Sequence, residues 1–311
     1  MTETVAIAIR FGLYVDLMLL FGLPMFGLYA LRGTERRSGE VIAFRGLLAS
    51  LALLGLGSSV LALLVLAASM SGVPLGAVDR GAVDALVSGT SIGTAWQVRM
   101  AALLLTLYLA IAGWKRPVVA LIGSAAAAGV ALASLAWTGH GAMDEGTRGF
   151  IHLTSDILHL LAAGVWIGAL VSLVLLIFRP ATRMVAEHII LSHRALDEFA
   201  TIGSLIVGVI VVSGLVNSWV LVGPANLGGL FTTLYGQLLL IKLVLFLAML
   251  AFAAVNRFRL TPALEATLEN GGHAAAVSAL RRSLVLEATA ALAILGLVAW
   301  LGTLSPPASG M

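Results

Sequence analysis

The stretch VVALIGSAAAAGVALASLAW, residues 118–137, decides the fold of this chain. It contains no charged side chain, and its length matches the roughly 20 mainly apolar residues that a helix needs to cross a bilayer. It lacks the strict alternation of apolar and polar residues that a half-buried strand would show. Its many small residues allow helix backbones to approach closely. We therefore predict a transmembrane helix that packs in the centre of a helical bundle.

The composition of the whole chain supports the same interpretation. Of its 311 residues, 60% are hydrophobic and 11% are charged, and the mean hydropathy is +1.06. A soluble domain has about 25% charged residues. We therefore predict an all-α integral membrane protein with eight transmembrane helices in one bundle, which forms a single polytopic membrane domain over residues 1–311. The predicted spans are residues 5–31, 41–70, 95–114, 117–137, 150–178, 198–222, 231–256 and 283–304.

The distribution of basic residues predicts the orientation. They cluster in the loops after the first, third, fifth and seventh spans, and only Arg80 and Arg148 lie in the intervening loops. Because basic loops stay in the cytoplasm, we predict that the N-terminus and the C-terminus are both periplasmic, in the inner (plasma) membrane of a bacterium. The first span has Arg10 and Asp16 inside its apolar run and no basic segment before it. We therefore expect a retained span and not a cleaved signal peptide.

Three polar residues in the fifth span predict a metal site. They lie in the stretch WTGHGAMDEGTRGFIHLTSDILHLLAAGVWIG, residues 137–168, which begins on the predicted outer side. His152, Asp156 and His159 are spaced i, i+4 and i+7, so on a helix they share one face. Two imidazoles and a carboxylate can bind a borderline metal such as copper or zinc. Two alternatives stay open: an ordinary interfacial role for His152, and a plain hydrogen bond between Asp156 and His159.

The loop before this span offers two further ligands. The chain has no cysteine, so a metal must be held by His, Met, Asp or Glu. His140 and Met143 precede the fifth span and are predicted to close over the same point. A methionine thioether favours Cu(I), whereas His and Asp ligands also accept Cu(II).

Other polar residues inside the spans are candidates for a pathway. Asp16 in the first span, Asn217 in the sixth, and Tyr235 and Lys242 in the seventh are predicted to line a polar interior or to couple transport to protons. Ionisable groups within a membrane are costly and usually functional. Asp16 and Lys242 lie at similar depth, so one interpretation is a buried ion pair between them. Glu287, near the inner end of the eighth span, is expected to pair with a neighbouring arginine.

Four segments carry a resemblance to a known family. They are GTAWQVRMAALL at residues 93–104, DILHLLAAGVWIGAL at 156–170, FTTLYGQLLLIKLVLFLAMLAFAAVNRFRLTP at 231–262 and LRRSLVLEATAALAILGLVAWLGTLSPP at 280–307. The chain resembles the copper resistance D (CopD) family of bacterial inner-membrane proteins over most of its length. The resemblance implies an eight-helix protein of copper uptake or handling. It also implies a separate periplasmic copper-binding partner of the CopC type.

These observations favour a copper-binding transporter or permease, and not an enzyme. The substrate would be a copper ion, Cu(I) or Cu(II). No P-loop motif is present, so we do not expect transport to be driven directly by ATP hydrolysis. The inner side has no cysteine pair or Met-rich segment, which leaves the release side unassigned. Two alternatives are a transmembrane electron-transfer protein with haem b between axial histidines and a non-transporting membrane partner of a copper chaperone.

Overall fold

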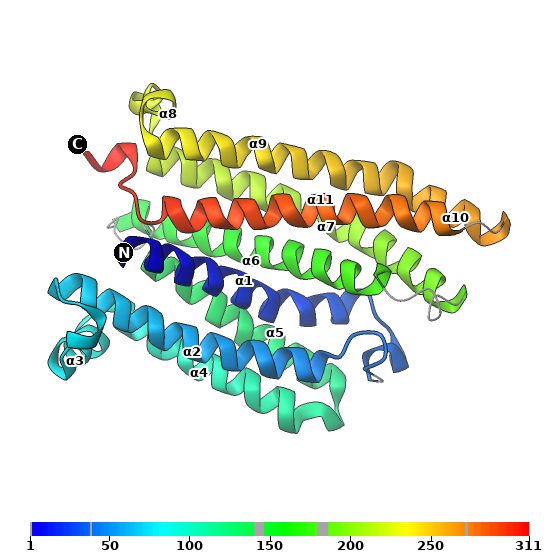
Figure 1. Cartoon of the computed structure of the whole chain (residues 1–311), viewed down its shortest axis with the longest axis horizontal. Helices are drawn as coiled ribbons and strands as arrows, with labels where there is room; N and C mark the ends of the chain where they lie inside the picture. Colours follow the sequence, from blue (N-terminus) through cyan, green and yellow to red (C-terminus); the bar gives the residue numbers. More distant parts are fainter. Residues whose placement is uncertain (1, 38, 140–145, 179–185, 271–272, 311) are drawn as a thin grey trace.

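The chain folds into long helices, seen in a computed structural model that describes residues 2–37, 39–139, 146–178, 186–270 and 273–310 (Figure 1). Within these ranges every regular element is a helix and no strand is present, so the all-α prediction is confirmed. The α-helices are α1 (Thr2–Tyr29), α2 (Phe44–Ser71), α3 (Arg80–Gly89), α4 (Ser91–Ala112), α5 (Pro117–Ala133), α6 (Gly146–Ile177), α7 (Ala186–Leu221), α8 (Gly229–Thr232), α9 (Leu234–Val255), α10 (Thr261–Asn270) and α11 (His273–Leu301).

Eight of the described helices are long and apolar enough to cross a membrane, which confirms the predicted number of spans. They are α1, α2, α4, α5, α6, α7, α9 and α11. Many of their large apolar side chains face outward; Leu205 and Leu215 of α7, for example, are 70% and 67% exposed. In water such a surface would be an aggregation hazard, whereas lipid chains solvate it. The outward apolar surface therefore supports a membrane-spanning bundle.

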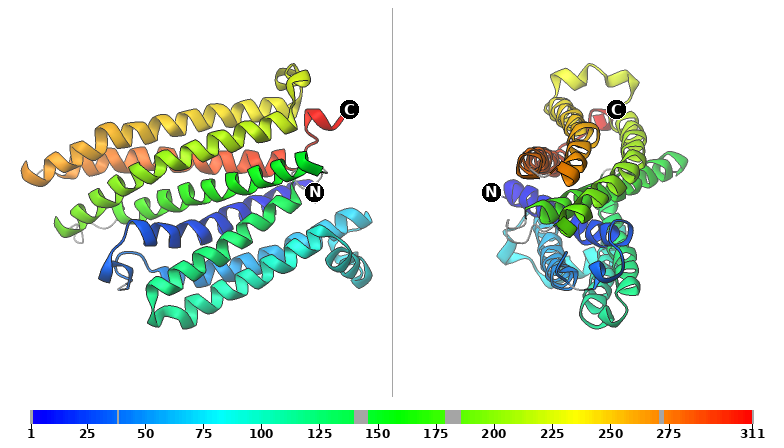
Figure 2. Two further views of the ribbon diagram at one scale, coloured as in Figure 1. Left: turned by 180° about the vertical axis from the view of Figure 1, so that it is seen from behind. Right: turned by 90° about the vertical axis from the view of Figure 1, so that its right-hand side faces the viewer.

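Helices α1 and α6 lie side by side in the middle of the molecule (Figures 1 and 2). Helices α2, α4 and α5 cover one side of this pair, and α7, α9 and α11 cover the other. Both termini, α3 and α8 lie at one end of the bundle, here called the terminal end (Figure 1). The 3₁₀ helix η1 (Gly33–Arg36) and α10 lie at the opposite, distal end. That the terminal end faces the periplasm stays a prediction from the arginine distribution.

Capping residues fix where several helices begin. The side chain of Thr90 accepts a hydrogen bond from Gly93 N at the start of α4, and Thr233 accepts one from Gly236 N at the start of α9. Such caps satisfy backbone N–H groups that have no partner inside the helix. The short helix α3, which precedes α4, lies outside the predicted spans, whereas α8, which precedes α9, overlaps the predicted start of the seventh span at residue 231. Both spans therefore begin at a defined turn at the terminal end.

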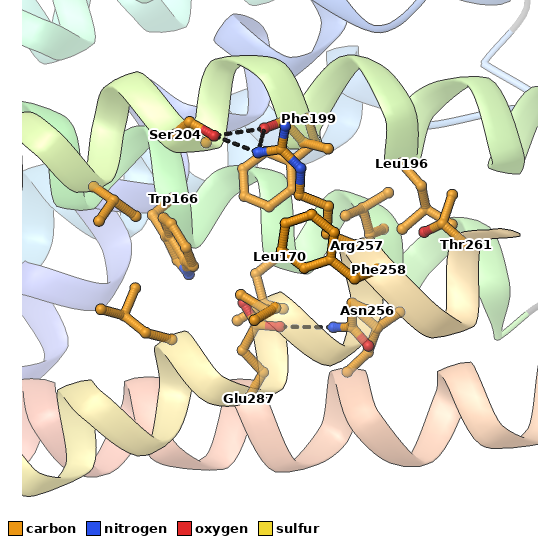
Figure 3. Close-up of a pocket in the computed structure, with 18 residues that line it drawn as sticks. Trp166, Leu170, Leu196, Phe199, Ser204, Asn256, Arg257, Phe258, Thr261 and Glu287 are labelled. Carbon is orange, nitrogen blue, oxygen red and sulfur yellow. Dashed lines mark hydrogen bonds between the residues drawn. The ribbon is translucent and has the colours of Figure 1, made fainter.

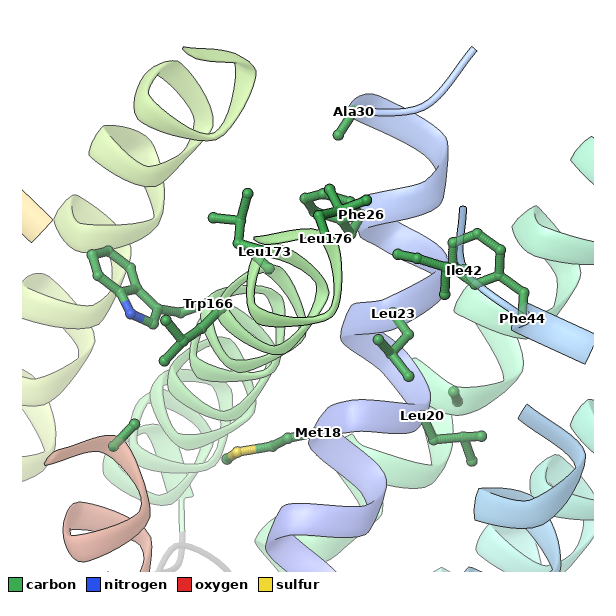
Figure 4. Packing of buried hydrophobic residues seen from close by; sticks show 14 of the residues in the cluster. Met18, Leu20, Leu23, Phe26, Ala30, Ile42, Phe44, Trp166, Leu173 and Leu176 are labelled. Atoms are coloured by element: carbon green, nitrogen blue, oxygen red, sulfur yellow. The ribbon is translucent and has the colours of Figure 1, made fainter. Parts of the chain in front are cut away.

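A close crossing of α1 and α6 holds the centre of the fold. A Cβ atom on Gly22 would lie 2.1 Å from the carbonyl oxygen of Gly164, and one on Gly168 would lie 2.2 Å from the carbonyl carbon of Gly22. Only glycine permits this approach, and Gly164 and Gly168 have the small-xxx-small spacing of close helix pairs in membranes. Around the crossing, Met18 of α1 is directed toward α6 and Leu20 away from it (Figure 4).

Candidate functional site

The polar face of α6 packs against α7. Asn217 Nδ2 donates a hydrogen bond to Asp156 Oδ1 at 3.3 Å, and His159 Nδ1 lies 3.0 Å from Ser213 Oγ. Ser155 Oγ donates to the carbonyl oxygen of Ser213 at 3.0 Å. Ser213 and Asn217 are one helical turn apart, which matches the spacing of Asp156 and His159 on the facing helix. These five residues form a polar seam, called the α6–α7 seam below.

Hydrogen bonding in the α6–α7 seam assigns the protons of His159. Ser213 Oγ donates its single hydrogen to the carbonyl oxygen of Val209 at 2.6 Å, so toward the imidazole it acts as an acceptor. Nδ1 of His159 therefore carries the hydrogen of a neutral ring, and this tautomer is assigned from the hydrogen-bond network. Nε2 then keeps its lone pair, which is the form of histidine that binds a metal.

His159 and Lys242 line one cavity of about 460 Å³ between α6, α7, α9 and α11. We call it the His159 cavity. Lys242 lies within electrostatic range of both Asp156 and His159, and Tyr235 lies within range of Asp156. The other walls are mainly apolar, so charge interactions inside are weakly screened. Five predicted pathway and site residues are thus linked by a hydrogen bond, by the shared cavity or by electrostatic interaction: Asp156, His159, Asn217, Tyr235 and Lys242.

The remaining predicted ligands are not brought into one cluster. His152 lies one turn before Asp156, is 2% exposed and interacts with that carboxyl electrostatically. His140 and Met143 lie outside the described residues. In the described part of the chain, no three His, Asp or Glu side chains are arranged to hold a metal ion. The five-residue copper site therefore stays a prediction, of which the α6–α7 seam contains Asp156 and His159.

Asp16 lies apart from this site. Its side chain is 2% exposed, and neither carboxyl oxygen has a hydrogen-bond partner among the described residues. It packs against α2, where the Cβ position of Gly55 is 2.7 Å from Asp16 Oδ2, so glycine provides the space for the carboxyl. The buried ion pair between Asp16 and Lys242 does not form. Lys242 lies instead within electrostatic range of Asp156.

The histidine arrangement does not favour a haem between facing helices. His152 and His159 are both on α6. The histidines of α7 are His188 and His193, and Ser213, the α7 residue that meets His159, is 25 positions beyond His188. At about 1.5 Å per residue that separation is roughly 37 Å. His188 Nε2 also lies 2.9 Å from the carbonyl oxygen of Leu176 at the far end of α6.

The prediction that Glu287 pairs with a neighbouring arginine is wrong. Glu287 Oε2 accepts a hydrogen bond from Asn256 Nδ2 at 2.9 Å, and no described arginine forms an ion pair with it. Ser213 is a residue that the sequence interpretation missed. Its signal was available, because Ser213 lies four positions before Asn217 on the same face of a predicted helix.

Comparison with known proteins gives a consistent result. A family model described as "Copper resistance protein D-like, N-terminal domain" matches residues 1–150, and one described as "Copper resistance protein D" matches residues 193–301. The chain is 47% identical over 308 residues to "Copper resistance protein D" of Pseudomonas syringae pv. tomato, covering 98% of both chains.

Two more distant relatives also match. "Inner membrane protein YebZ" of Escherichia coli (strain K12) is 29% identical over 266 residues, covering 82% of this chain and 84% of the relative. "Copper transport protein CutJ" of Bacillus subtilis (strain 168) is 29% identical over 257 residues, covering 78% of this chain and 44% of the relative. No solved structure matches the chain.

Proposed function

Because the chain belongs to the copper resistance protein D family, we propose that it takes copper from the periplasm and carries it across the bacterial inner membrane. It is a copper-related, multi-pass membrane protein of the inner membrane. In this proposal copper is the transported substrate, and the protein is a carrier and not an enzyme. A periplasmic copper-binding protein of the CopC type would deliver the ion at the terminal end.

The observation that carries the proposal is the conjunction of the α6–α7 seam with the His159 cavity. Asp156 and His159 supply a carboxylate oxygen and an imidazole nitrogen, both ligands for borderline metals. The hydrogen bonds from Asn217 to Asp156 and between His159 and Ser213 hold both side chains in place. Fixed ligand orientation raises metal affinity. The cavity gives an ion held there space to move between α6, α7, α9 and α11.

The start of α6 would capture the ion before it reaches the seam. His152 precedes Asp156 by one turn on the terminal side of α6, and His140 with Met143 precedes the helix in sequence. In the predicted orientation these residues meet the periplasm first. Copper would then pass from His152 to Asp156 and His159, which lie about 6 and 10 Å farther along the helix.

Lys242 suggests how the step couples to protons. Its ammonium group and a copper ion are both cations, and both are attracted to the Asp156 carboxylate. In a poorly screened cavity the two compete, because like charges repel strongly there. Copper entry would therefore favour loss of the Lys242 proton. A Lys242→Met variant should bind copper at Asp156 without releasing that proton.

Copper uptake into proteoliposomes tests the proposal. Wild-type protein should admit copper, and His159→Ala and Asp156→Ala should admit much less. His193→Ala is the matched control, because His193 is a histidine of α7 that pairs with Glu265 at 3.7 Å, away from the seam. Equal uptake by wild type and both seam variants would overturn the proposed route. Copper binding without uptake by wild type would instead support a non-transporting partner of a copper chaperone.

A further inference from the structure

A second cavity lies toward the distal end of the same helices. Its volume is about 310 Å³, and α6, α7, α11 and the end of α9 surround it (Figure 3). We call it the Glu287 cavity. Most of its lining is apolar, with Glu287, Asn256 and Arg257 as its strongly polar residues. Trp166 lines this cavity and the His159 cavity, and it is the residue that the two linings share. Its ring is therefore a common wall between them.

Glu287 has an incomplete hydrogen-bond set in this cavity. The side chain is 2% exposed, and Oε2 accepts from Asn256 Nδ2 at 2.9 Å. Three polar atoms make no hydrogen bond of normal geometry among the described residues: Glu287 Oε1, Asn256 Oδ1 and Trp166 Nε1. The Trp166 side chain nevertheless interacts with the Glu287 carboxyl. The ring nitrogen of Trp166 points toward the part of the cavity that holds Glu287 and Asn256 (Figure 3). Buried polar groups without partners are rare and call for an explanation.

No described cation neutralises the carboxyl. Arg257 is the other charged residue that lines the cavity, and its Nη1 donates to the carbonyl oxygen of Ala200 at 2.8 Å and to Ser204 Oγ. Arg281, on the same helix as Glu287, donates from Nε to the carbonyl oxygen of Ile177 at 2.9 Å. The described lining residues from α6 and α7 are uncharged. Burying an ionised carboxylate with no counter-ion is very costly.

A local change of helix type places Asn256 against this carboxyl. The chain continues from α9 into the π-helix η8 (Asn256–Leu260) before α10 begins. Such π-helical turns are rare and occur often at functional sites. Asn256 is its first residue and is 7% exposed. The wider turn thus coincides with a buried amide that contacts Glu287.

We propose that Glu287 binds a proton and is the proton site on the distal side of the transport helices. A proton from water at the distal end would bond to Glu287 Oε1 and give a neutral carboxylic acid, and it would return to the same side on release. Asn256 positions the acid through Oε2, and Arg257 lines the route to the distal end. The proposed coupling of this proton to copper movement rests on the proposed transport function, whereas the protonation itself does not.

Infrared spectroscopy of the purified full chain in lipid tests the protonation. Wild-type protein should show the carbonyl band of a protonated carboxylic acid, and Glu287→Gln should lose the Glu287 part of that band. Glu265→Gln is the control, because Glu265 is an exposed acid of α10 and should leave the band unchanged. A wild-type band that persists fully in Glu287→Gln would overturn the assignment. If Glu287→Gln fails to fold, Asn256→Ala must shift the band, and an unshifted band overturns it equally.

Proton release in proteoliposomes tests the coupling. In vesicles with the distal end facing inward, a pH-sensitive dye inside should report a proton released on copper entry with wild type, and this signal should be reduced in Glu287→Gln while copper binding persists. Glu287→Asp, which keeps the carboxyl, should restore part of it. Wild-type vesicles that admit no copper would contradict the transport function and leave the infrared result to decide on Glu287. Copper uptake with normal proton movement in Glu287→Gln would overturn the coupling role alone.

Discussion

The two faces of α6 are built in opposite ways. One face carries Gly164 and Gly168 and meets α1 at backbone contact, so no space remains between the two helices. The other face carries His159 and Trp166, which line two cavities toward α7, α9 and α11. Polar atoms without partners, on Trp166 and on Glu287 across from it, lie on this second side.

The difference separates stability from function within a single helix. Close backbone packing resists rearrangement because dense interiors deform little, so the α1–α6 crossing acts as a fixed support. Cavities with unsatisfied polar atoms reduce stability and persist where a function requires them. Asp16 is another buried acid whose carboxyl oxygens have no hydrogen-bond partner among the described residues. It lies against Gly55 of α2, on the opposite side of the α1–α6 pair, and its role in a pathway stays a prediction.

The largest expected effect comes from filling the α1–α6 crossing. Gly168→Val adds a side chain where a Cβ already meets the backbone of Gly22 at 2.2 Å. Overpacking costs about 1–3 kcal/mol when flexible side chains can adjust, and a backbone contact cannot adjust in that way. We expect Gly168→Val to prevent folding, measured as loss of the monodisperse peak in detergent chromatography.

Gly208→Val is the matched control for this variant. Gly208 lies in α7, and a Cβ atom there meets nothing within 4 Å. The control should accumulate at the wild-type level. If both variants accumulate equally, the crossing is not the support that the comparison assigns to it.

The next effect in size concerns the wall between the cavities. Trp166→Leu removes most of the ring that both cavities share, and it also removes an edge-to-face contact with Phe199 at 5.5 Å. We expect the passive proton leak of proteoliposomes to rise severalfold, measured by decay of an imposed pH gradient. Trp219→Leu is the control, because Trp219 of α7 is 68% exposed. An unchanged leak in Trp166→Leu would show that the ring does not separate the cavities.

The eight spans were predictable because neighbouring residues in the sequence are enough to indicate each one. A run of apolar residues of bilayer length identifies a helix without knowledge of its neighbours. The α1–α6 crossing was not predictable in this way. Gly164 and Gly168 show the right spacing, but their partner Gly22 lies far away in the chain, and only the fold pairs them. Nor did hydropathy indicate the π-helix at Asn256, since the run of apolar residues ends there.

The candidate site was predictable to the extent that one helix determines it. The spacing of Asp156 and His159 placed both on one face of α6, and that face packs against α7 as a unit. Their partners depended on long-range packing. Asn217 was a candidate on chemistry alone, and Ser213 was missed. An arginine was predicted as the partner of Glu287 because several arginines lie near it in sequence. The observed partner, Asn256, is 31 positions away.

A smaller effect is expected within the α6–α7 seam. Ser213→Ala removes the hydroxyl that accepts from His159 Nδ1, so the imidazole loses its fixed orientation. Removing a group that orients a metal ligand typically weakens metal binding by about 10-fold or more. We expect copper affinity, measured by competition with a chelator, to fall by about 10-fold without loss of folding.

The control for Ser213→Ala is another intrahelical serine. Ser58 of α2 donates to the carbonyl oxygen of Leu54 in its own helix at 2.8 Å. Ser58→Ala should keep the wild-type copper affinity. Equal affinity for Ser213→Ala and wild type would mean that His159 is not a copper ligand in the orientation that the seam gives it.

The smallest expected effect concerns an ion pair at the distal end. Arg194 Nη2 of α7 bonds both carboxyl oxygens of Glu35 in η1, at 2.8 and 2.6 Å. Burial by itself would raise the pKa of Glu35, but the bonds from Arg194 and from Arg32 N outweigh it and hold that pKa below its ordinary value. The ion pair therefore stabilises the fold above the ordinary glutamate pKa of about 4.3. This contribution is lost as the pH falls through the lowered value.

Because the pair is partly solvated, it should contribute no more than about 1 kcal/mol, well below the cost of filling the glycine crossing. Glu35→Gln should lower thermal stability slightly at pH 7 and should reduce its decline on acidification from about pH 5 downward. Glu3→Gln, an exposed acid at the start of α1, is the control for lost charge. A large destabilisation by Glu35→Gln at neutral pH would mean that charge pairs, and not backbone packing around α6, hold the two sides of the bundle together.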